Sequence, residues 1–147
     1  MNLLSIAHTP ILVTPDATVT QAVEASLAAR VGAVAVLEGG SLCGIFTERD
    51  MMYKVVAARL DPDTTPVGQV MTTPVHTIAP DTRPDEVLEL MLARHIRHLP
   101  VSRDGKAVEG MLSIRNILQY LVGHLRRDLG YLEAYITDSP TGSTSSH

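Results

Sequence analysis

The segment Gly44-Ile45-Phe46-Thr47-Glu48-Arg49-Asp50 occurs in a second version, Gly110-Met111-Leu112-Ser113-Ile114-Arg115-Asn116, 66 residues further along the chain. In both versions a glycine and two apolar residues lead to a hydroxyl residue, and an acidic or amide residue follows three positions later. This pattern is typical of a β-strand that turns directly into a helix, with the hydroxyl residue at the boundary. A corner that occurs twice predicts a chain built from two copies of one unit.

The repeat extends in both directions from these corners. An offset of 65 residues aligns Pro15-Asp16 with Pro80-Asp81, and one added residue in the second copy then gives the offset of 66. A unit of about 60 residues buries too little surface to be stable alone, so we expect the copies to pack as a pseudo-two-fold pair with a pocket at the seam. The chain divides into a first repeat (1–65), a second repeat (66–125), a C-terminal helical extension (126–137) and a tail expected to be disordered (138–147).

Each copy predicts the order strand, helix, strand, strand, helix, which is a mixed α/β (α+β) fold. Thr18 and Gln21 resemble a capping box at the start of the first helix, and Pro84 suits the first turn of its counterpart. In the first copy we expect the elements 11–13, 19–30, 33–37, 42–46 and 49–60. In the second copy we expect 75–78, a helix that begins near residue 84, 99–102, 107–112 and 115–125.

The composition argues against several classes of protein. The 147 residues are 45% hydrophobic and 19% charged, which fits a compact globular chain. The single cysteine, Cys43, excludes an intramolecular disulfide and a four-cysteine zinc site, so we expect a reducing, cytoplasmic location. No apolar run is long enough to span a membrane. With a net charge of −4, no Trp and one Phe, we expect no direct nucleic-acid binding.

The first corner allows two interpretations. Thr47 and Asp50 have the spacing of a plain helix cap, in which the two side chains satisfy backbone N–H groups. The same place suits a phosphorylated sugar, because free N–H groups at a helix start attract phosphate and a carboxylate accepts hydroxyl hydrogen bonds. In the second corner Asn116 caps as well but is neutral.

The densest basic segment, 94–98, lies where the second copy passes from helix to strand. Arg94 and His95 complement the negative end of the helix dipole. Arg97 and His98 belong to the following strand, where a charge needs solvent or an anion. His95 and His98 do not share one helical face, so we expect no metal site.

No motif of an enzyme is present. The sequence lacks a Gly-x-Ser-x-Gly elbow, a P-loop and a Gly-x-Gly-x-x-Gly loop, so we expect neither catalytic residues nor a catalytic cofactor. Cys43 precedes a glycine inside an expected strand and fits a small buried side chain.

Together these motifs resemble a tandem pair of CBS domains, the Bateman module. The resemblance covers about residues 8–125 and rests on the two corners, on Val70-Met71-Thr72-Thr73-Pro74-Val75 at the junction, and on Ile96-Arg97-His98-Leu99-Pro100-Val101. The chain also resembles the free-standing bacterial kind, which has no attached enzyme, channel or transporter. The resemblance implies a regulatory module that binds an adenosine compound such as AMP, ADP, ATP, NAD or S-adenosylmethionine in a cleft composed from both copies.

The resemblance implies one main cleft. Asp50 would bind the ribose diol, Thr47 and Arg49 the phosphate side, Val75 and Ile96 the faces of the adenine, and Arg97 or His98 the distal charge. The residues implied for this cleft are Ile45, Thr47, Arg49, Asp50, Pro74, Val75, His76, Ile96, Arg97, His98 and Pro100.

The symmetry-related cleft is expected to be weak or empty. Asn116 replaces the usual acidic residue, and the segment 31–33 offers no cation. The residues implied for this second cleft are Thr9, Pro10, Ile11, Val31, Met111, Ser113, Arg115 and Asn116.

Two functions remain open. One is a nucleotide sensor that signals to an unidentified regulated protein. The other is a scaffold that dimerises and docks to a partner with both clefts empty, since family members commonly form disc-shaped homodimers. Apolar residues on the closing helices and the extension would supply that surface, since amphipathic helices need a second surface to cover them. These are Val55, Val56, Leu118, Leu121, Leu125, Leu129 and Leu132.

Overall fold

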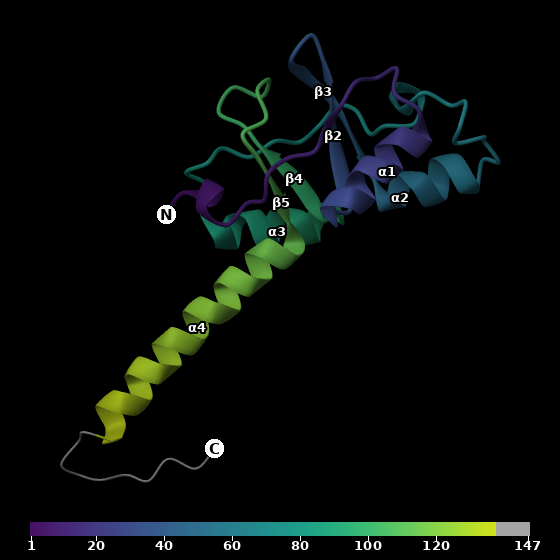
Figure 1. Cartoon of the computed structure of the whole chain (residues 1–147). Coiled ribbons are helices and arrows are strands. Elements are labelled where there is room, and N and C mark those ends of the chain that lie inside the picture. The colour runs from purple at the N-terminus through teal and green to yellow at the C-terminus, as the bar shows by residue number, and fades with distance from the viewer. Residues whose placement is uncertain (138–147) are drawn as a thin grey trace.

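The structure is a computed structural model that describes residues 1–137. It contains two similar halves, each with a small β-sheet beside its helices (Figure 1). The predicted mixed α/β fold, a pair of repeated units, is confirmed. The tail that the sequence predicts to be disordered, 138–147, lies outside the described residues.

The first half has a three-stranded sheet in the order β1-β2-β3, with β1 parallel to β2 and β3 antiparallel to it. The predicted capping box is present, because Thr18 accepts the N–H of Gln21 and the Gln21 side chain accepts the N–H of Thr18. The bounds are β1 (Leu12–Val13), α1 (Val19–Ala29), β2 (Ala33–Glu38), β3 (Ser41–Thr47) and α2 (Glu48–Asp50), which continues as a π-helical segment (Met51–Val56).

The second half has a two-stranded antiparallel sheet, β4-β5. Pro84 occupies the first position of α3, as predicted. The bounds are α3 (Pro84–Arg94), β4 (His98–Val101), β5 (Gly110–Ser113) and α4 (Ile114–Thr137), and short 3-10 turns lie at Leu3–Ser5 and Val67–Gln69.

The strand predicted at 75–78 is wrong, since only Ile78 makes a bridge, to Val101. In the first half the N–H of Ala35 donates to the carbonyl of Ile11 at 2.8 Å and anchors β1. The counterpart of Ala35 is Pro100, which has no N–H to donate. The second half therefore lacks this bond, and its sheet has one strand fewer.

Two other predicted boundaries are also wrong. β5 begins at Gly110 rather than at residue 107, because Asp104 Oδ1 accepts the N–H groups of Lys106 (2.9 Å) and Ala107 (3.0 Å) and turns the chain. The helix predicted to reach residue 60 ends at Val56, where the N–H of Ala57 bonds to the carbonyl of Met52, a wide five-residue turn.

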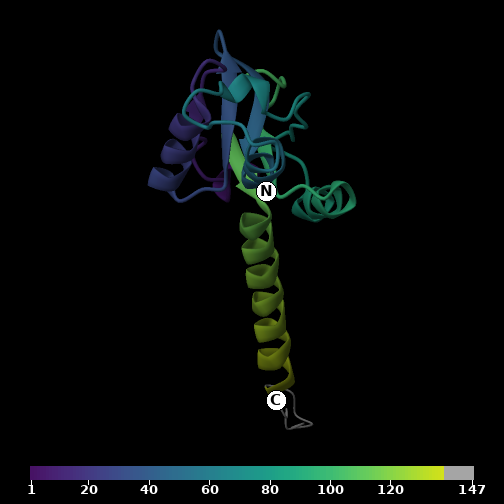
Figure 2. The same cartoon turned by 90° about the vertical axis from the view of Figure 1, so that its right-hand side faces the viewer.

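The predicted end of the last helix near residue 125 is wrong as well. α4 runs without a break to Thr137, so the segment 126–137 continues the closing helix of the second half. α4 leaves the rest of the molecule as a single rod, which both views show (Figures 1 and 2). No helix among residues 1–137 combines the length and the apolar character that crossing a membrane requires.

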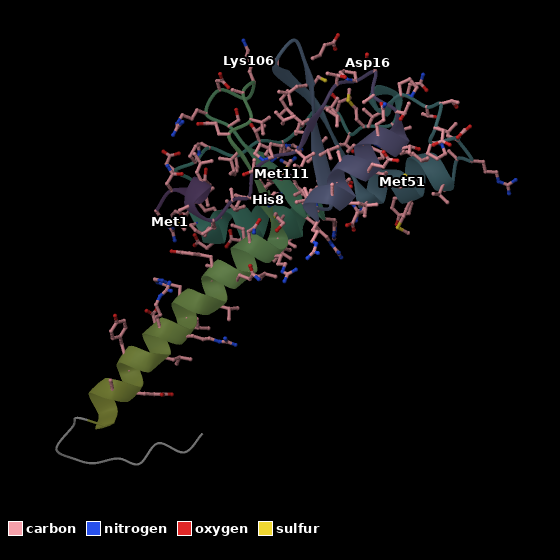
Figure 3. All side chains as sticks on the ribbon, viewed as in Figure 1. Met1, His8, Asp16, Met51, Lys106 and Met111 are labelled. Atoms are coloured by element: carbon pink, nitrogen blue, oxygen red, sulfur yellow. The ribbon has the colours of Figure 1, made fainter. Side chains whose placement is uncertain are left out.

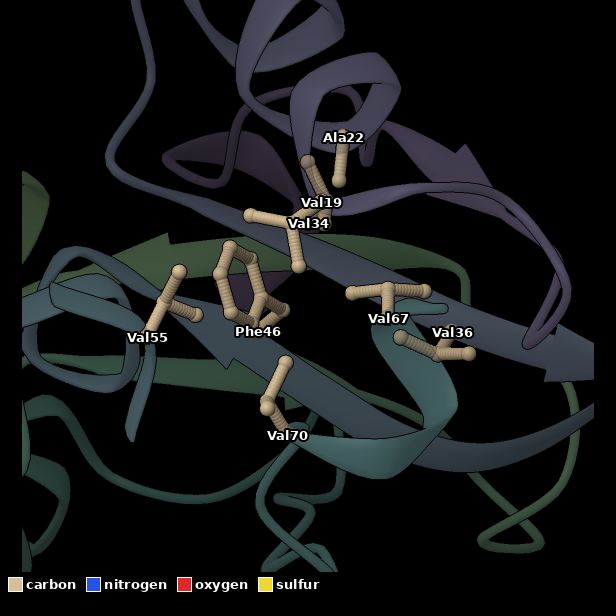
Figure 4. Close-up of a cluster of buried hydrophobic side chains, with 8 residues drawn as sticks. All are labelled: Val19, Ala22, Val34, Val36, Phe46, Val55, Val67 and Val70. Carbon is tan, nitrogen blue, oxygen red and sulfur yellow. The ribbon is translucent and has the colours of Figure 1, made fainter. Parts of the chain in front are cut away.

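Each half has its own hydrophobic core. Phe46 is central in the first core, surrounded by valines of β2, the π-helical segment and the Val67–Gln69 turn (Figure 4). The second core packs α3 and the start of α4 against β4 and β5. A third, smaller cluster contains Ala33, Ala35 and Ile45 from the first half and Met111 from the second, and it joins the two sheets.

The halves also exchange their opening segments. Thr72, at the start of the second half, pairs antiparallel with Ile45 of β3, with hydrogen bonds of 2.8 and 3.0 Å. His8, at the start of the first half, pairs in the same way with Met111 of β5, and Figure 3 shows these two residues close together. Because each half contributes the same kind of bridge to the other, the two halves are related by a pseudo-two-fold axis.

Candidate functional site

A cleft of about 380 Å³ lies between the first corner and the turn from α3 to β4. It is composite, because one wall comes from each half. Its lining residues are Ile45, Thr47, Glu48, Arg49, Asp50, Met52, Tyr53, Thr72, His95, Ile96, Arg97 and His98.

The cleft contains seven of the eleven residues predicted for the main site: Ile45, Thr47, Arg49, Asp50, Ile96, Arg97 and His98. The other four lie outside its lining. Val75 packs beside Ile45 in the cluster that joins the sheets, and Pro74 precedes it in the same segment. His76 accepts a hydrogen bond from Arg94 at 2.8 Å, and Pro100 is buried within β4.

The first corner forms the predicted helix cap. Asp50 Oδ2 accepts the backbone N–H of Thr47 at 3.0 Å and the Thr47 hydroxyl at 3.2 Å. The Thr47 oxygen in turn accepts the N–H of Asp50 at 3.4 Å. The capping interpretation is therefore confirmed, and it uses only one of the two carboxylate oxygens.

The other carboxylate oxygen of Asp50 holds two partners that the sequence analysis missed. Asp50 Oδ1 accepts the hydroxyl of Thr72 at 2.8 Å and forms an ion pair with Lys54 Nζ at 3.0 Å. Lys54 also donates to Thr72 at 3.2 Å, so the three groups form a closed set. Asp50 is only 3% exposed, and the nearby ammonium group offsets the cost of burying its charge.

Arg49 links the two walls of the cleft. Its Nη1 donates to the backbone carbonyl of His95 at 3.1 Å. His95 ends α3 in a left-handed conformation with φ of 54°, and its carbonyl is one of those that a helix end leaves without a partner. The guanidinium of Arg49 thus connects the two walls of the cleft and also adds a positive charge to it.

Arg97 supplies the available cation. It is exposed immediately before β4, and its side chain has no hydrogen-bond or ion-pair partner within the part of the chain that the structure describes. His98 is different, because burial, together with the nearby His8 and Arg97, lowers the pKa of its imidazole to about 4. His98 is therefore neutral at pH 7, and of the two residues predicted for the distal charge only Arg97 carries one.

The second corner repeats the cap without the charge. Asn116 Oδ1 accepts the N–H and the hydroxyl of Ser113, both at 2.9 Å, and lies 3.2 Å from Nδ1 of His8. His8 occupies the place that Thr72 has in the first corner, and the sequence analysis missed it. Exchange of the opening segments brings it there.

The remaining residues predicted for the second cleft surround this corner. Met111 is fully buried and pairs with His8, while Arg115 is exposed at the start of α4. The counterpart of Arg97 is Gly32, where an added Cβ would lie 2.7 Å from a carboxylate oxygen of Glu48 and 3.2 Å from the His98 ring. The others, Thr9, Pro10, Ile11 and Val31, lie on the segments before β1 and β2.

No three His, Cys, Asp or Glu side chains among the described residues gather to hold a metal ion. Cys43 is half-buried, and burial and the charge of Glu38 raise the pKa of its thiol. Neither observation points to a reactive centre in this part of the chain.

The fold and the composite cleft define a tandem pair of CBS domains, and comparison with known proteins agrees. The CBS domain family matches residues 5–57 and 67–123, so the chain belongs to this family. It is 37% identical, over 84% of its length, to the "CBS domain-containing protein CBSX3, mitochondrial" of Arabidopsis thaliana. The chain spans 62% of that protein and smaller fractions of the next relatives, 16% and 22%.

Solved structures show the same fold. A putative signal-transduction protein with CBS domains from Burkholderia ambifaria superposes with a TM-score of 0.78 at 29% identity, covering 84% of this chain and 95% of the other. A CBS domain protein from Pyrobaculum aerophilum, complexed with AMP, superposes with a TM-score of 0.70 at 25% identity, covering 84% and 99%. A CBS pair is a regulatory module, and proteins of the family are generally not catalytic.

Proposed function

We propose that this chain is a non-enzymatic sensor that binds an adenosine-containing nucleotide in the main cleft. The observation that carries the proposal is the position of Asp50 and Arg97 on opposite walls of one cleft. A buried carboxylate suits the two hydroxyl groups of a ribose, and a guanidinium without a partner suits a phosphate. The Pyrobaculum aerophilum relative complexed with AMP supports this class of ligand.

The lining suggests how each part of the ligand is held. Ile45 and Ile96, one from each half, offer apolar surfaces for the two faces of the adenine ring. Asp50 would bind the ribose through Oδ1, so the hydroxyl groups must share this oxygen with Thr72 and Lys54 or displace them. Arg97 would bind the phosphate, with Thr47 and Arg49 beside it.

The charges of the lining favour ligands with few phosphates. Asp50 and Glu48 balance Arg49 and Arg97, His98 is neutral, and Arg49 already donates to His95. A triphosphate would meet one free guanidinium. Among AMP, ADP, ATP, NAD and S-adenosylmethionine, this arrangement ranks AMP first, and the second cleft is proposed to be weak or empty.

The regulated partner would respond to the ligand through the arrangement of the halves. A ligand that touches both walls adds contacts between them, and its effect on a partner depends on its different affinities for the alternative arrangements. The single cysteine agrees with a reducing compartment, and we propose a cytoplasmic location and a homodimeric assembly.

A second candidate is a dimerising scaffold with empty clefts. Two of the residues predicted for this surface are not available, because Val55 is buried in the first core and Leu121 packs against the second. The exposed apolar residues of α4, such as Leu125 (59%) and Leu132 (55%), favour the scaffold. Dimerisation through α4 is compatible with an occupied cleft, because no residue of α4 lines the main cleft; the two candidates differ in whether a nucleotide binds.

Thermal unfolding with AMP, ATP, NAD and S-adenosylmethionine tests the sensor proposal. A ligand at one hundred times its Kd stabilises the fold by about 2.7 kcal/mol. We expect Asp50→Asn to abolish the response to AMP, because the amide keeps the cap and removes the charge. The matched control Asp85→Asn changes an exposed aspartate at the start of α3 and is expected to respond like the wild type. No response of the wild type to any of the four compounds would reject the sensor.

A further inference from the structure

α4 carries two apolar faces, and the rest of the described chain covers only one of them. Near the start of the helix, Ile117 is fully buried and Leu121 packs against the core of the second half. The other face, which we call the α4 seam, is between 43% and 59% exposed at each position. It consists of Leu118, Val122, Leu125, Leu129 and Leu132.

The spacing of the α4 seam is that of a coiled coil. Its members follow one another at intervals of four, three, four and three residues, an average of 3.5. This heptad spacing keeps a seam in line along two helices that wind around each other with a left-handed twist. Leucine occupies every d position (118, 125, 132), and Val122 and Leu129 occupy the a positions. The β-branched Val122 at an a position, between leucines at d, favours two parallel strands.

The outer part of α4 extends away from the other helices and strands that the structure describes. Beyond the first turns of the helix no other described element lies beside it in either view (Figures 1 and 2). An isolated helix as short as the segment 126–137 is marginally stable in water. Gly123 and Gly130 lower the stability of α4 further, by about 1 kcal/mol each relative to alanine. A surface that covers the α4 seam would therefore stabilise this part of the helix.

We propose that the α4 seam of a second copy of this chain covers it, as a short, parallel, two-stranded coiled coil. In this arrangement every layer pairs with its own counterpart, Leu125 with Leu125 and Leu132 with Leu132. Covering the half-exposed side chains on both copies removes on the order of 1,000 Å² from water, the size at which an interface between copies becomes specific. A partner with the same heptad spacing is needed for knobs-into-holes packing, and a second copy provides it.

The proposed contact is independent of nucleotide binding. The main cleft contains no residue of α4. At its base the seam turns away from the core of the second half, since Leu118 and Val122 are exposed beside the buried Ile117. The second copy therefore joins the first along the rod and leaves the cleft open.

Analytical ultracentrifugation of the full chain tests the contact with a matched pair of variants. Leu125→Lys with Leu132→Lys puts two charges, seven residues apart, into d layers of the seam. Gly123→Lys with Gly130→Lys puts two charges, also seven residues apart, on the outer side of the helix. An added Cβ meets nothing within 4 Å at either glycine, so these side chains have room.

We expect the wild type and the glycine variant to sediment as dimers. We expect the leucine variant to sediment as a monomer, with association weakened roughly a hundredfold or more. Its response to AMP should match that of the wild type, which shows that the two halves remain folded. A monomeric wild type, or a leucine variant that dimerises as well as the glycine variant, would overturn the proposal.

Cross-linking tests the parallel register separately. In a Cys43→Ala background, Leu125→Cys is expected to oxidise to a covalent dimer, because its layer pairs with itself within the reach of a disulfide. Gly130→Cys, on the outer side, should stay largely monomeric under the same oxidant. A dimeric chain that cross-links through position 130 and not through position 125 contradicts the parallel arrangement.

Discussion

The two corners of this molecule share one backbone arrangement and differ in charge. Asp50 and Asn116 each accept an N–H and a hydroxyl from the residue three positions earlier, at distances between 2.9 and 3.2 Å. A neutral amide thus completes the cap as well as a carboxylate does. The cap alone gives no reason for a negative charge in the first corner.

The surroundings of the two corners differ in the same sense. Lys54 and Thr72 hold the free oxygen of Asp50, whereas His8 lies beside Asn116, and the counterpart of Lys54 is Tyr120, which stacks on His124. The first corner therefore keeps a charge at the edge of a cleft, and the second has no such charge.

The largest effect on stability is expected from a third difference between the halves, at His98, whose counterpart in the first half is Ala33. Burial, together with the nearby His8 and Arg97, lowers the pKa of the His98 imidazole from 6.5 to about 4. Between pH 6.5 and 4 the His98 imidazole is therefore protonated in the unfolded chain and neutral in the folded chain. The free energy of unfolding is highest above pH 6.5 and falls by about 3 kcal/mol as the pH falls toward 4.

The variant His98→Ala copies the first half and should remove this dependence. We expect urea unfolding between pH 4 and 7 to show a flatter profile for His98→Ala than for the wild type. The change in slope is the readout, since the substitution also alters packing at every pH. Parallel profiles of the two proteins would show that His98 titrates normally.

The next largest effect compares alanine in the two corners. Asp50→Ala removes the cap and leaves Thr72 and Lys54 without their common partner, so we expect a loss of about 2 to 3 kcal/mol. Asn116→Ala removes the cap and the contact with His8, and we expect about 1 kcal/mol. Denaturant unfolding at pH 7 measures both. Equal losses would show that the charged surroundings of Asp50 add nothing to folding.

The substitution Arg97→Gly removes the exposed cation from the main cleft and gives this position the residue of its counterpart in the first half, Gly32. The side chain is exposed and makes no ion pair in the described chain, so folding should change little. Binding of AMP should weaken about tenfold, or 1.4 kcal/mol. Calorimetry at low and high salt should find the difference reduced at high salt. Undiminished affinity would remove Arg97 from the phosphate site.

The smallest effect is expected when the second corner is given a carboxylate. Asn116→Asp introduces the carboxylate that we propose as the ribose acceptor in the first corner, but Gly32 still supplies no cation. We expect a second, weak binding event in calorimetry, with a gain of less than about 1 kcal/mol. Combining Asn116→Asp with Gly32→Arg should raise it further if Glu48 moves aside. A stoichiometry that stays at one in both variants would show that the second cleft is closed for another reason.

Much of this comparison could be predicted from the sequence, because a repeat at a fixed offset gives the order of elements twice. Thr18, Gln21 and Pro84 predicted their helix starts correctly, since capping depends on neighbours within three residues. The two corners were predicted for the same reason. Pro100 was also visible, and its missing N–H could have excluded the strand at 75–78.

The partners of the corners could not be predicted in this way. Thr72 reaches Asp50 across 22 residues, and His8 reaches Asn116 across 108 residues, so both depend on how the opening segments exchange. The ion pair between Asp50 and Lys54 could have been predicted, because Lys54 follows Asp50 by four residues, the spacing of side chains that meet on one face of a helix. The pKa of His98 depends on burial, which the sequence around it does not reveal.

The exchanged opening segments have a consequence for the integrity of the module. The contact that completes β3 is encoded in the second half, and the contact that completes β5 is encoded in the first. A polypeptide with only one half would have to obtain the pairing segment of its last strand from a second molecule. The covalent link between the halves thus fixes their ratio at one to one, and it frees one corner to diverge while the other keeps its charge.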